Sequence, residues 1–184
     1  IHSTQMLQYE VVNLAKTGAV AGLCPITESS LGDGIFEGVR WLENKGKIAI
    51  GSDSNIRISL SEELRTLDYS QRLRDNSRAA LADCSYSTGR KLFQEICTGG
   101  ALAAGRKTGK ISVGYWADLM SLDTTHIDLE FRNGDSLLDC FIFAGDDRMI
   151  SNVWSAGRHM VEGGKHINRE EITTLYRSAI KNLS

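Results

Sequence analysis

Two residues in this sequence carry chemically active side chains and come just after apolar residues. His2 follows Ile1, and Asp53 lies in the run Ile50-Gly51-Ser52-Asp53-Ser54, where an apolar stretch enters a polar turn. In parallel α/β proteins, functional residues gather at the carboxyl ends of the strands. An imidazole and a carboxylate there are candidates for proton transfer or metal binding. Each also has a purely structural interpretation: the aspartate as a turn former or helix cap, the histidine as a surface residue.

The remaining histidines and the cysteines show no spacing typical of a metal site. His126, His159 and His166 are irregularly spaced, and we expect them at the surface or in turns. The four cysteines form no Cys-x-x-Cys pair, which excludes zinc fingers and thioredoxin-like sites. We expect free, buried thiols in a reduced, cytoplasmic compartment.

Composition narrows the class of protein further. The chain has 184 residues, of which 41% are hydrophobic and 24% charged, with a formal net charge of −2. This balance indicates a globular protein. No basic stripe favours a nucleic-acid partner, and no apolar run approaches the ~18 residues that would span a membrane.

The first half of the sequence alternates helical and strand patterns. Residues 5–16 have an amphipathic helical pattern, and 19–24 form an apolar run of strand length that Pro25 ends. After a loop containing Gly32 and Gly34, a second helix leads to the short strand 47–51. Strands joined through helices are parallel, so this half is α/β.

Two longer helices and a β-rich region are predicted next. A Ser59–Glu62 capping box begins a helix reaching about residue 82, and a helix over 89–104 carries small residues suited to close packing. Strands are predicted at 118–123, 137–144 and 149–160, with Gly157-Arg158 in a hairpin turn. Asn168 caps a last helix, whose apolar face is Ile172, Leu175, Tyr176, Ala179 and Ile180.

Several motifs, in the same order, resemble the amidohydrolase deaminases. Leu23-Cys24-Pro25-Ile26-Thr27-Glu28 with Leu31-Gly32-Asp33-Gly34 resembles the seventh-strand signature, in the Thr-Glu form of the formiminoglutamate deiminase branch. Gly51-Ser52-Asp53-Ser54 resembles the eighth-strand motif, and residues 101–119 resemble the exit from the barrel. His2-Ser3-Thr4-Gln5 departs from the branch's usual His-Ala-Thr-His only in part.

The resemblance implies a fold and a division of the chain. Residues 1–105 would be the last strands and helices (strands six to eight) of a (β/α)8 TIM-type barrel. Residues 106–184 would form part of a small β-sandwich and a C-terminal helix. Because two or three strands cannot close a barrel, and because the chain opens on Ile1, we expect it to be a fragment that requires an N-terminal part of the same polypeptide.

The resemblance also implies a site. One Zn²⁺ per active site would be held by Asp53 and by histidines outside this chain, while His2 would stabilise charge beside the nucleophile. Arg57 is a candidate for binding a substrate carboxylate, although an exposed loop arginine is its plainer interpretation. The isolated fragment, with one clear ligand, is expected to bind zinc poorly and to be inactive.

The reaction implied is hydrolytic deimination of N-formimino-L-glutamate, a small molecule of histidine degradation, to N-formyl-L-glutamate and ammonia, by a homodimer. Two alternatives stay open. One is another deaminase or chlorohydrolase of the superfamily acting on a purine, pyrimidine or triazine ring, which aromatic pocket walls would favour. The other is a non-catalytic scaffold that retains the fold.

Overall fold

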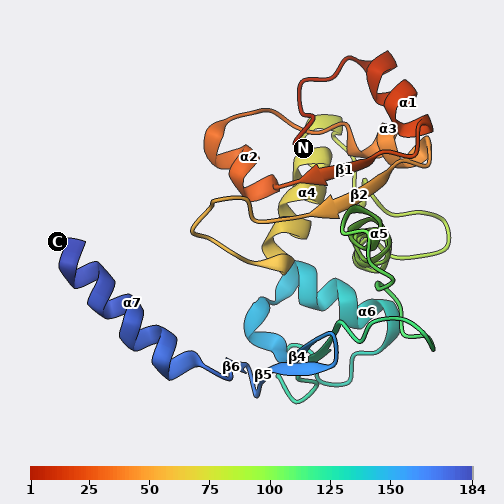
Figure 1. Cartoon of the computed structure of the whole chain (residues 1–184). Helices are drawn as coiled ribbons and strands as arrows, with labels where there is room; N and C mark the ends of the chain where they lie inside the picture. The colour runs from red at the N-terminus through yellow and green to blue at the C-terminus, as the bar shows by residue number, and fades with distance from the viewer. Residues whose placement is uncertain (184) are drawn as a thin grey trace.

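The computed structural model describes residues 1–183 (Figure 1). The elements, in chain order, are α1 (Gln8–Lys16), β1 (Val20–Leu23), α2 (Pro25–Leu31), α3 (Gly38–Glu43), β2 (Lys47–Ile50), α4 (Leu60–Asp75), α5 (Thr88–Ala103), β3 (Leu119–Leu122), α6 (Gly134–Asp139), the π-helical turn η1 (Cys140–Ala144), the 3-10 turn η2 (Asp147–Met149), β4 (Ile150–Ser155), β5 (Arg158–Glu162), β6 (Lys165–His166) and α7 (Arg169–Leu183).

The strands β1 and β2 pair in parallel, as the alternation of strand and helix predicted. Val20 lies opposite Lys47 and Leu23 opposite Ile50, so both strands end at the same edge. The connection between them contains α3 and also α2, which was not expected. Pro25 both ends the strand and begins this helix, and Gly32, with φ 71°, ends it in the left-handed conformation.

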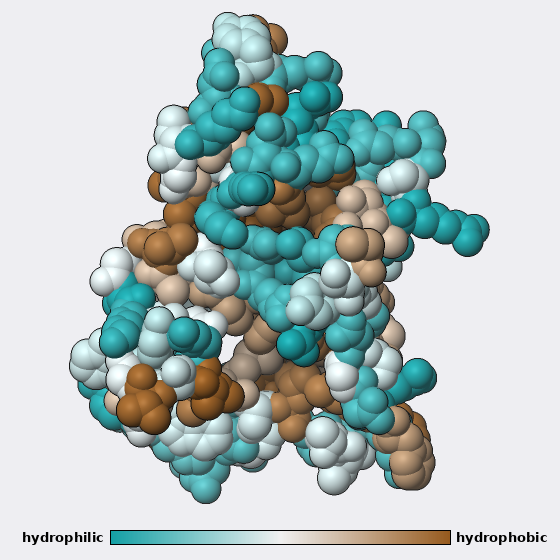
Figure 2. Space-filling model, turned by 90° about the vertical axis from the view of Figure 1, so that its right-hand side faces the viewer, coloured by the Kyte–Doolittle hydropathy of each residue, from teal (hydrophilic) through white to brown (hydrophobic). Residues whose placement is uncertain are grey.

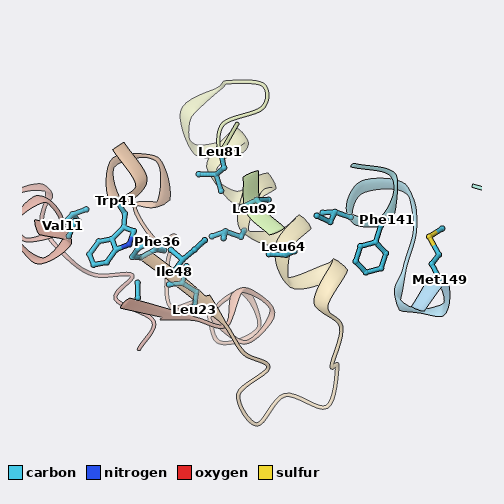
Figure 3. Close-up of a cluster of buried hydrophobic side chains, with 14 of the residues drawn as sticks. Val11, Leu23, Phe36, Trp41, Ile48, Leu64, Leu81, Leu92, Phe141 and Met149 are labelled. Atoms are coloured by element: carbon cyan, nitrogen blue, oxygen red, sulfur yellow. The ribbon is translucent and has the colours of Figure 1, made fainter. Parts of the chain in front are cut away.

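One hydrophobic cluster runs through the chain from the parallel strands to η1 (Figure 3). Trp41 is fully buried, packs edge-on against Phe36 at 5.6 Å, and donates its indole N–H to the Lys47 carbonyl. Buried Leu64 and Leu92 connect this region to Phe141, Ile142 and Met149. The two halves of the sequence therefore share a core.

Helix α5 lies directly on β2. A β-carbon built on Gly99 would meet the Ile48 carbonyl oxygen at 1.8 Å, whereas one built on the neighbouring Gly100 would meet nothing within 4 Å. The close approach expected from the small residues of this helix is therefore confirmed at Gly99. Because β2 leads into Asp53, this contact fixes the strand that carries a candidate site residue.

Gly99→Ala is expected to lower the free energy of unfolding by about 3 kcal/mol, because the clash is with backbone that cannot move aside. Gly100→Ala is the matched control and should be neutral or stabilising by up to about 1 kcal/mol through helix propensity. Urea unfolding of both variants measures the difference. Equal stabilities would show that α5 does not pack on β2 this closely.

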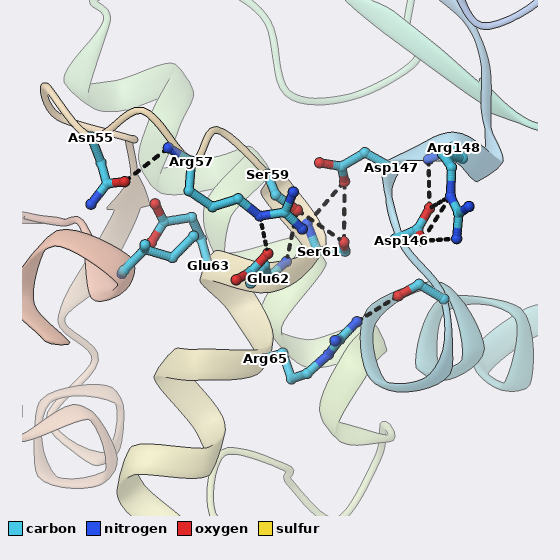
Figure 4. A network of polar contacts seen from close by, with 12 residues as sticks. Asn55, Arg57, Ser59, Ser61, Glu62, Glu63, Arg65, Asp146, Asp147 and Arg148 are labelled. Atoms are coloured by element: carbon cyan, nitrogen blue, oxygen red, sulfur yellow. Dashed lines mark hydrogen bonds and ion pairs between the residues drawn. The ribbon is translucent and has the colours of Figure 1, made fainter. Parts of the chain in front are cut away.

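The second sheet is antiparallel, in the order β3-β4-β5-β6. Ala156 and Gly157, with φ of 51° and 80°, form the turn between β4 and β5, so the hairpin is confirmed and its turn lies one residue earlier than expected. Three polar side chains tie this half to the first (Figure 4). Arg65 donates to the carbonyls of Ile142 and Gly145, and Asp147 accepts from Ser61 at the start of α4.

Two predicted elements are wrong in type or length. Residues 137–144 form the end of α6 and the turn η1, not a strand. Phe141 and Ile142 are fully buried, and a short apolar run of this kind does not distinguish a buried helix from a strand. Helix α4 ends at Asp75, not near 82, because Asn76 takes the left-handed conformation with φ 51°.

The C-terminal helix α7 extends away from the body and buries none of its described residues (Figure 1). The helix forms as predicted, but its apolar face is not covered: Ile172, Leu175 and Tyr176 are all exposed. Elsewhere, Figure 2 shows a face on which hydrophilic side chains prevail and apolar ones emerge in separate groups. Within the described residues, no helix combines the length and apolar composition needed to cross a bilayer.

A candidate active site at the ends of two parallel strands

His2 lies beside the end of β1. Its backbone N–H donates to the Gly22 carbonyl at 2.8 Å, so the first residues run alongside the strand. The side chain of Ile1 packs against Gly22: a β-carbon built on Gly22 would lie 3.8 Å from Ile1 Cγ1. This pairing brings the imidazole to the carboxyl edge of the sheet.

Asp53 lies in the turn that follows β2. The Gly51 N–H donates to the Leu23 carbonyl at 3.0 Å, which extends the strand pairing to within two residues of the aspartate. Asp53 has φ 53° and accepts the Ser54 N–H on Oδ1 at 2.7 Å, leaving Oδ2 for other contacts. His2 is also left-handed, with φ 64°. Such backbone is uncommon in residues other than glycine and concentrates at functional sites.

The structure brings the two candidates together. His2 Nε2 lies 3.4 Å from Asp53 Oδ2, and their side chains are 31% and 36% exposed. The imidazole and the carboxylate therefore face one another at the surface, at the carboxyl edge of the parallel pair. This is the arrangement that proton transfer at a bound substrate requires.

Helix α2 contacts His2 and, through Ser52, the turn that carries Asp53. Glu28 Oε1 accepts the Cys24 N–H at 2.8 Å and lies 3.2 Å from His2 Nδ1, and its side chain is 6% exposed. Thr27 donates its hydroxyl to the Ser52 carbonyl at 3.3 Å, next to Asp53. Sequence reasoning used Thr27 and Glu28 only as parts of a motif and missed these contacts. The signal that predicts the helix is Pro25 at its first position with Glu28 in its first turn.

The donor set fits a zinc ion. His2, Cys24 and Asp53 each offer one ligand atom, and the three atoms lie within 4.8 Å of one another, the one such group found among residues 1–183. Imidazole nitrogen, sulfur and carboxylate oxygen are all zinc ligands. Burial raises the pKa of the Cys24 thiol, and the negative charges of Glu28, Asp53 and Glu63 raise it further. Without a cation, Cys24 is therefore a protonated thiol.

The buried carboxyl group of Glu63 contacts the start of α2. Glu63, in the first turn of α4, is 2% exposed and accepts the Ile26 N–H on Oε2 at 2.9 Å, while Oε1 has no partner. Burial raises the pKa of Glu63 to about 7; the Ile26 N–H opposes the shift and the charges of Glu28 and Glu62 add to it. In the folded protein this carboxyl group therefore keeps its proton to higher pH than in the unfolded chain.

The raised pKa predicts a stability that falls with pH. The folded state holds the Glu63 proton up to about pH 7 and the unfolded chain only to about 4.5, so this group's contribution is full below pH 4.5 and is lost by about pH 7. The loss should amount to about 3 kcal/mol and be absent in Glu63→Gln, whose amide oxygen still accepts from Ile26. Urea unfolding of the wild type and of Glu63→Gln at pH 5 and pH 8 measures this loss. The same change in the free energy of unfolding with pH in both proteins would contradict the prediction.

The other candidates lie apart from this pair. Arg57 is 60% exposed, and its Nε donates to Glu62 at 2.5 Å (Figure 4). His159 stacks on Trp154 in the second sheet, and His126 lies in a turn. All four thiols are free, as expected, but of the four only Cys24 is buried. The expectation of burial is wrong for Cys97 and Cys140, which are partly exposed, and for Cys84, which is exposed because residues 83–87 form a polar loop.

Known proteins resemble the chain over most of its length. Residues 1–160 match the sequence profile of the Amidohydrolase family. A formimidoylglutamate deiminase of Pseudomonas aeruginosa is 44% identical over 171 residues, which are 92% of this chain and 38% of that protein. The crystal structure of an amidohydrolase from Brucella melitensis superimposes with a TM-score of 0.91 at 42% identity, over 99% of this chain and 40% of that one.

A more distant structure shares the fold. An adenosine deaminase from Xanthomonas campestris, crystallised with bound zinc, has a TM-score of 0.80 at 23% identity, over 98% of this chain and 42% of its own. The chain thus spans about two fifths of the length of the proteins it matches.

Proposed function

Since the chain belongs to the amidohydrolase family, we propose that it forms part of a zinc-dependent hydrolase that converts N-formimino-L-glutamate to N-formyl-L-glutamate and ammonia. The observation that carries the proposal is the contact of His2 with Asp53 at the carboxyl edge of β1 and β2. The 44% identity to a formimidoylglutamate deiminase supports this substrate over others.

The chain would supply one side of a larger site. We propose that residues 1–105 contribute the closing strands and helices of a barrel, and residues 106–184 part of a β-sandwich and a terminal helix. The parallel pairing of β1 and β2 and the match to two fifths of longer relatives support this division. The remaining zinc ligands would come from the rest of the polypeptide, so the 184-residue chain alone should show no turnover.

Asp53 and His2 would divide the chemistry. A bound zinc ion would lower the pKa of its water and so supply hydroxide near neutral pH. Asp53 would hold the ion and accept a proton on the oxygen that faces His2. His2, beside that oxygen, would share this proton through Nε2 and in that form stabilise the negative charge that develops at the reacting centre.

Arg57 is the proposed partner of a substrate carboxylate. To bind it, the guanidinium would leave its exposed pair with Glu62, which costs little in water. In the full-length protein, Arg57→Ala should raise KM about fivefold and leave kcat unchanged, because the contact would be equal in ground and transition states. The control is Arg78→Ala, at another exposed arginine. Unchanged KM in both variants would remove Arg57 from the site.

Ammonia release from the full-length protein tests the function. Formiminoglutamate should be hydrolysed with a kcat/KM at least about 10²-fold above those for guanine, cytosine, adenosine and a chlorotriazine. Faster hydrolysis of a ring substrate would replace the proposal with the second candidate, a ring deaminase, which the likeness to an adenosine deaminase favours. Inactivity on every substrate, in protein containing zinc, would indicate a scaffold.

A further inference from the structure

We propose that Glu28 is a positioning residue for His2, acting through the imidazole Nδ1. It would fix which ring nitrogen carries the proton and hold the other beside Asp53. The inference rests on the proposed function for its catalytic consequence, but its structural part concerns only residues of this chain.

Burial and double use of one oxygen fix the Glu28 carboxylate. Oε1 accepts the Cys24 N–H at 2.8 Å and also lies 3.2 Å from His2 Nδ1. The side chain is 6% exposed and closely surrounded by other atoms, so a change of rotamer would be unfavourable. Glu28 also lies in the first turn of α2, which begins where β1 ends. Its place is therefore tied to the same strand that holds His2.

The chemistry of the contact assigns the proton. Both flanking carboxylates only accept hydrogen bonds, and a neutral imidazole has one N–H to offer them. The contact of Nδ1 with Glu28 has hydrogen-bond geometry, whereas the approach of Nε2 to Asp53 is an ion-pair contact only, so Nδ1 is the donor and Glu28 the acceptor. In a neutral ring Nε2 then has a free lone pair, and Nε2 is the atom 3.4 Å from Asp53 Oδ2. The partner of one ring nitrogen thus determines what the other can do. Glu28 makes Nε2 able to take a proton at the place where Asp53 lies.

A simpler role for Glu28 is to stabilise the start of α2 through the Cys24 N–H alone. The two roles differ in whether the effect depends on His2. In the full-length protein, Glu28→Ala should lower kcat 10- to 100-fold, the usual effect of losing the partner of a functional histidine, with KM changed less than threefold. In a His2→Gln background the same substitution should lower kcat less than threefold. Losses that multiply in the double variant would overturn the proposal.

Two further variants separate hydrogen bonding from packing. Glu28→Gln keeps an oxygen that accepts from both donors and should recover kcat to within about threefold of wild type. Ser29→Ala, on the same helix, removes only the 2.7 Å bond to the Pro25 carbonyl and should change kcat less than threefold. Activity of Glu28→Gln as low as that of Glu28→Ala would contradict positioning through an acceptor.

A spectroscopic measurement decides the structural part even if no substrate is turned over. In metal-free protein labelled with ¹⁵N-histidine, two-bond ¹H–¹⁵N correlations in alkaline solution should show the His2 proton on Nδ1, with His2→Gln providing the assignment. Glu28→Ala should move the proton to Nε2 or leave a mixture. An Nε2–H ring in the wild-type protein would refute the role of Glu28, whereas inactivity with an Nδ1–H ring would refute only the proposed function.

Discussion

Asp53→Asn is expected to lower kcat of the full-length protein by at least about 10³-fold and to reduce its bound zinc. Asparagine has the same shape and can keep the Oδ1 contact with the Ser54 N–H, so the turn after β2 should persist. What disappears is the negative charge on the atom that faces His2 at 3.4 Å. That charge would both hold the cation and accept the proton, and general-base catalysis alone contributes about 10²- to 10⁴-fold.

The control for Asp53 is the same change elsewhere. Asp75→Asn, at the end of α4, removes a carboxylate that pairs with Arg74 and should leave activity and zinc content unchanged. Steady-state kinetics, zinc analysis and thermal unfolding of both variants separate a lost function from a lost fold. An Asp53→Asn protein with full activity would exclude Asp53 from the chemistry.

His2→Gln should give a different pattern: kcat lower by about 10²- to 10³-fold, with zinc retained by the ligands outside this chain. The expected loss is that of one stabilising group at a developing charge. Glutamine can donate a hydrogen bond, but it cannot take up a proton beside Asp53, at 3.4 Å, while it donates to Glu28, at 3.2 Å. His2 is therefore expected to act on the reaction more than on the metal.

His166→Gln provides the comparison for His2. It replaces a histidine with glutamine in the same way, but on β6 in the second sheet, and should leave kcat unchanged. If His2→Gln lost zinc together with activity, His2 would be a metal ligand, consistent with its place in the His2, Cys24, Asp53 group.

The sequence predicted the positions of the two central residues better than their surroundings. Asp53 follows the apolar strand β2 and His2 follows Ile1. The predicted parallel pairing places Asp53 at the carboxyl edge, and the bond from the His2 N–H to Gly22 brings His2 to the same edge. The contacts of Thr27 and Glu28 could not be predicted in the same way. They depend on where a seven-residue helix points after β1, and its length and polar side chains leave no periodic pattern.

Burial explains where the predictions of secondary structure were wrong. Residues 137–144 contain the run Phe141–Ala144, and Phe141 and Ile142 are enclosed on all sides, so neither a strand nor a helix period can appear. The opposite holds for α7, whose helical period was predicted while its apolar face lies exposed. Periodicity predicts the element, and only the surrounding chain determines what it packs against.

Diffraction from crystals of the full-length protein, recorded on both sides of the zinc absorption edge, tests the central inference most directly. We predict an anomalous peak about 2.0 to 2.2 Å from an Asp53 carboxylate oxygen, with His2 beside it and its Nδ1 on Glu28. A zinc peak bound elsewhere, with Asp53 bonded only to the backbone of its own turn, would contradict it.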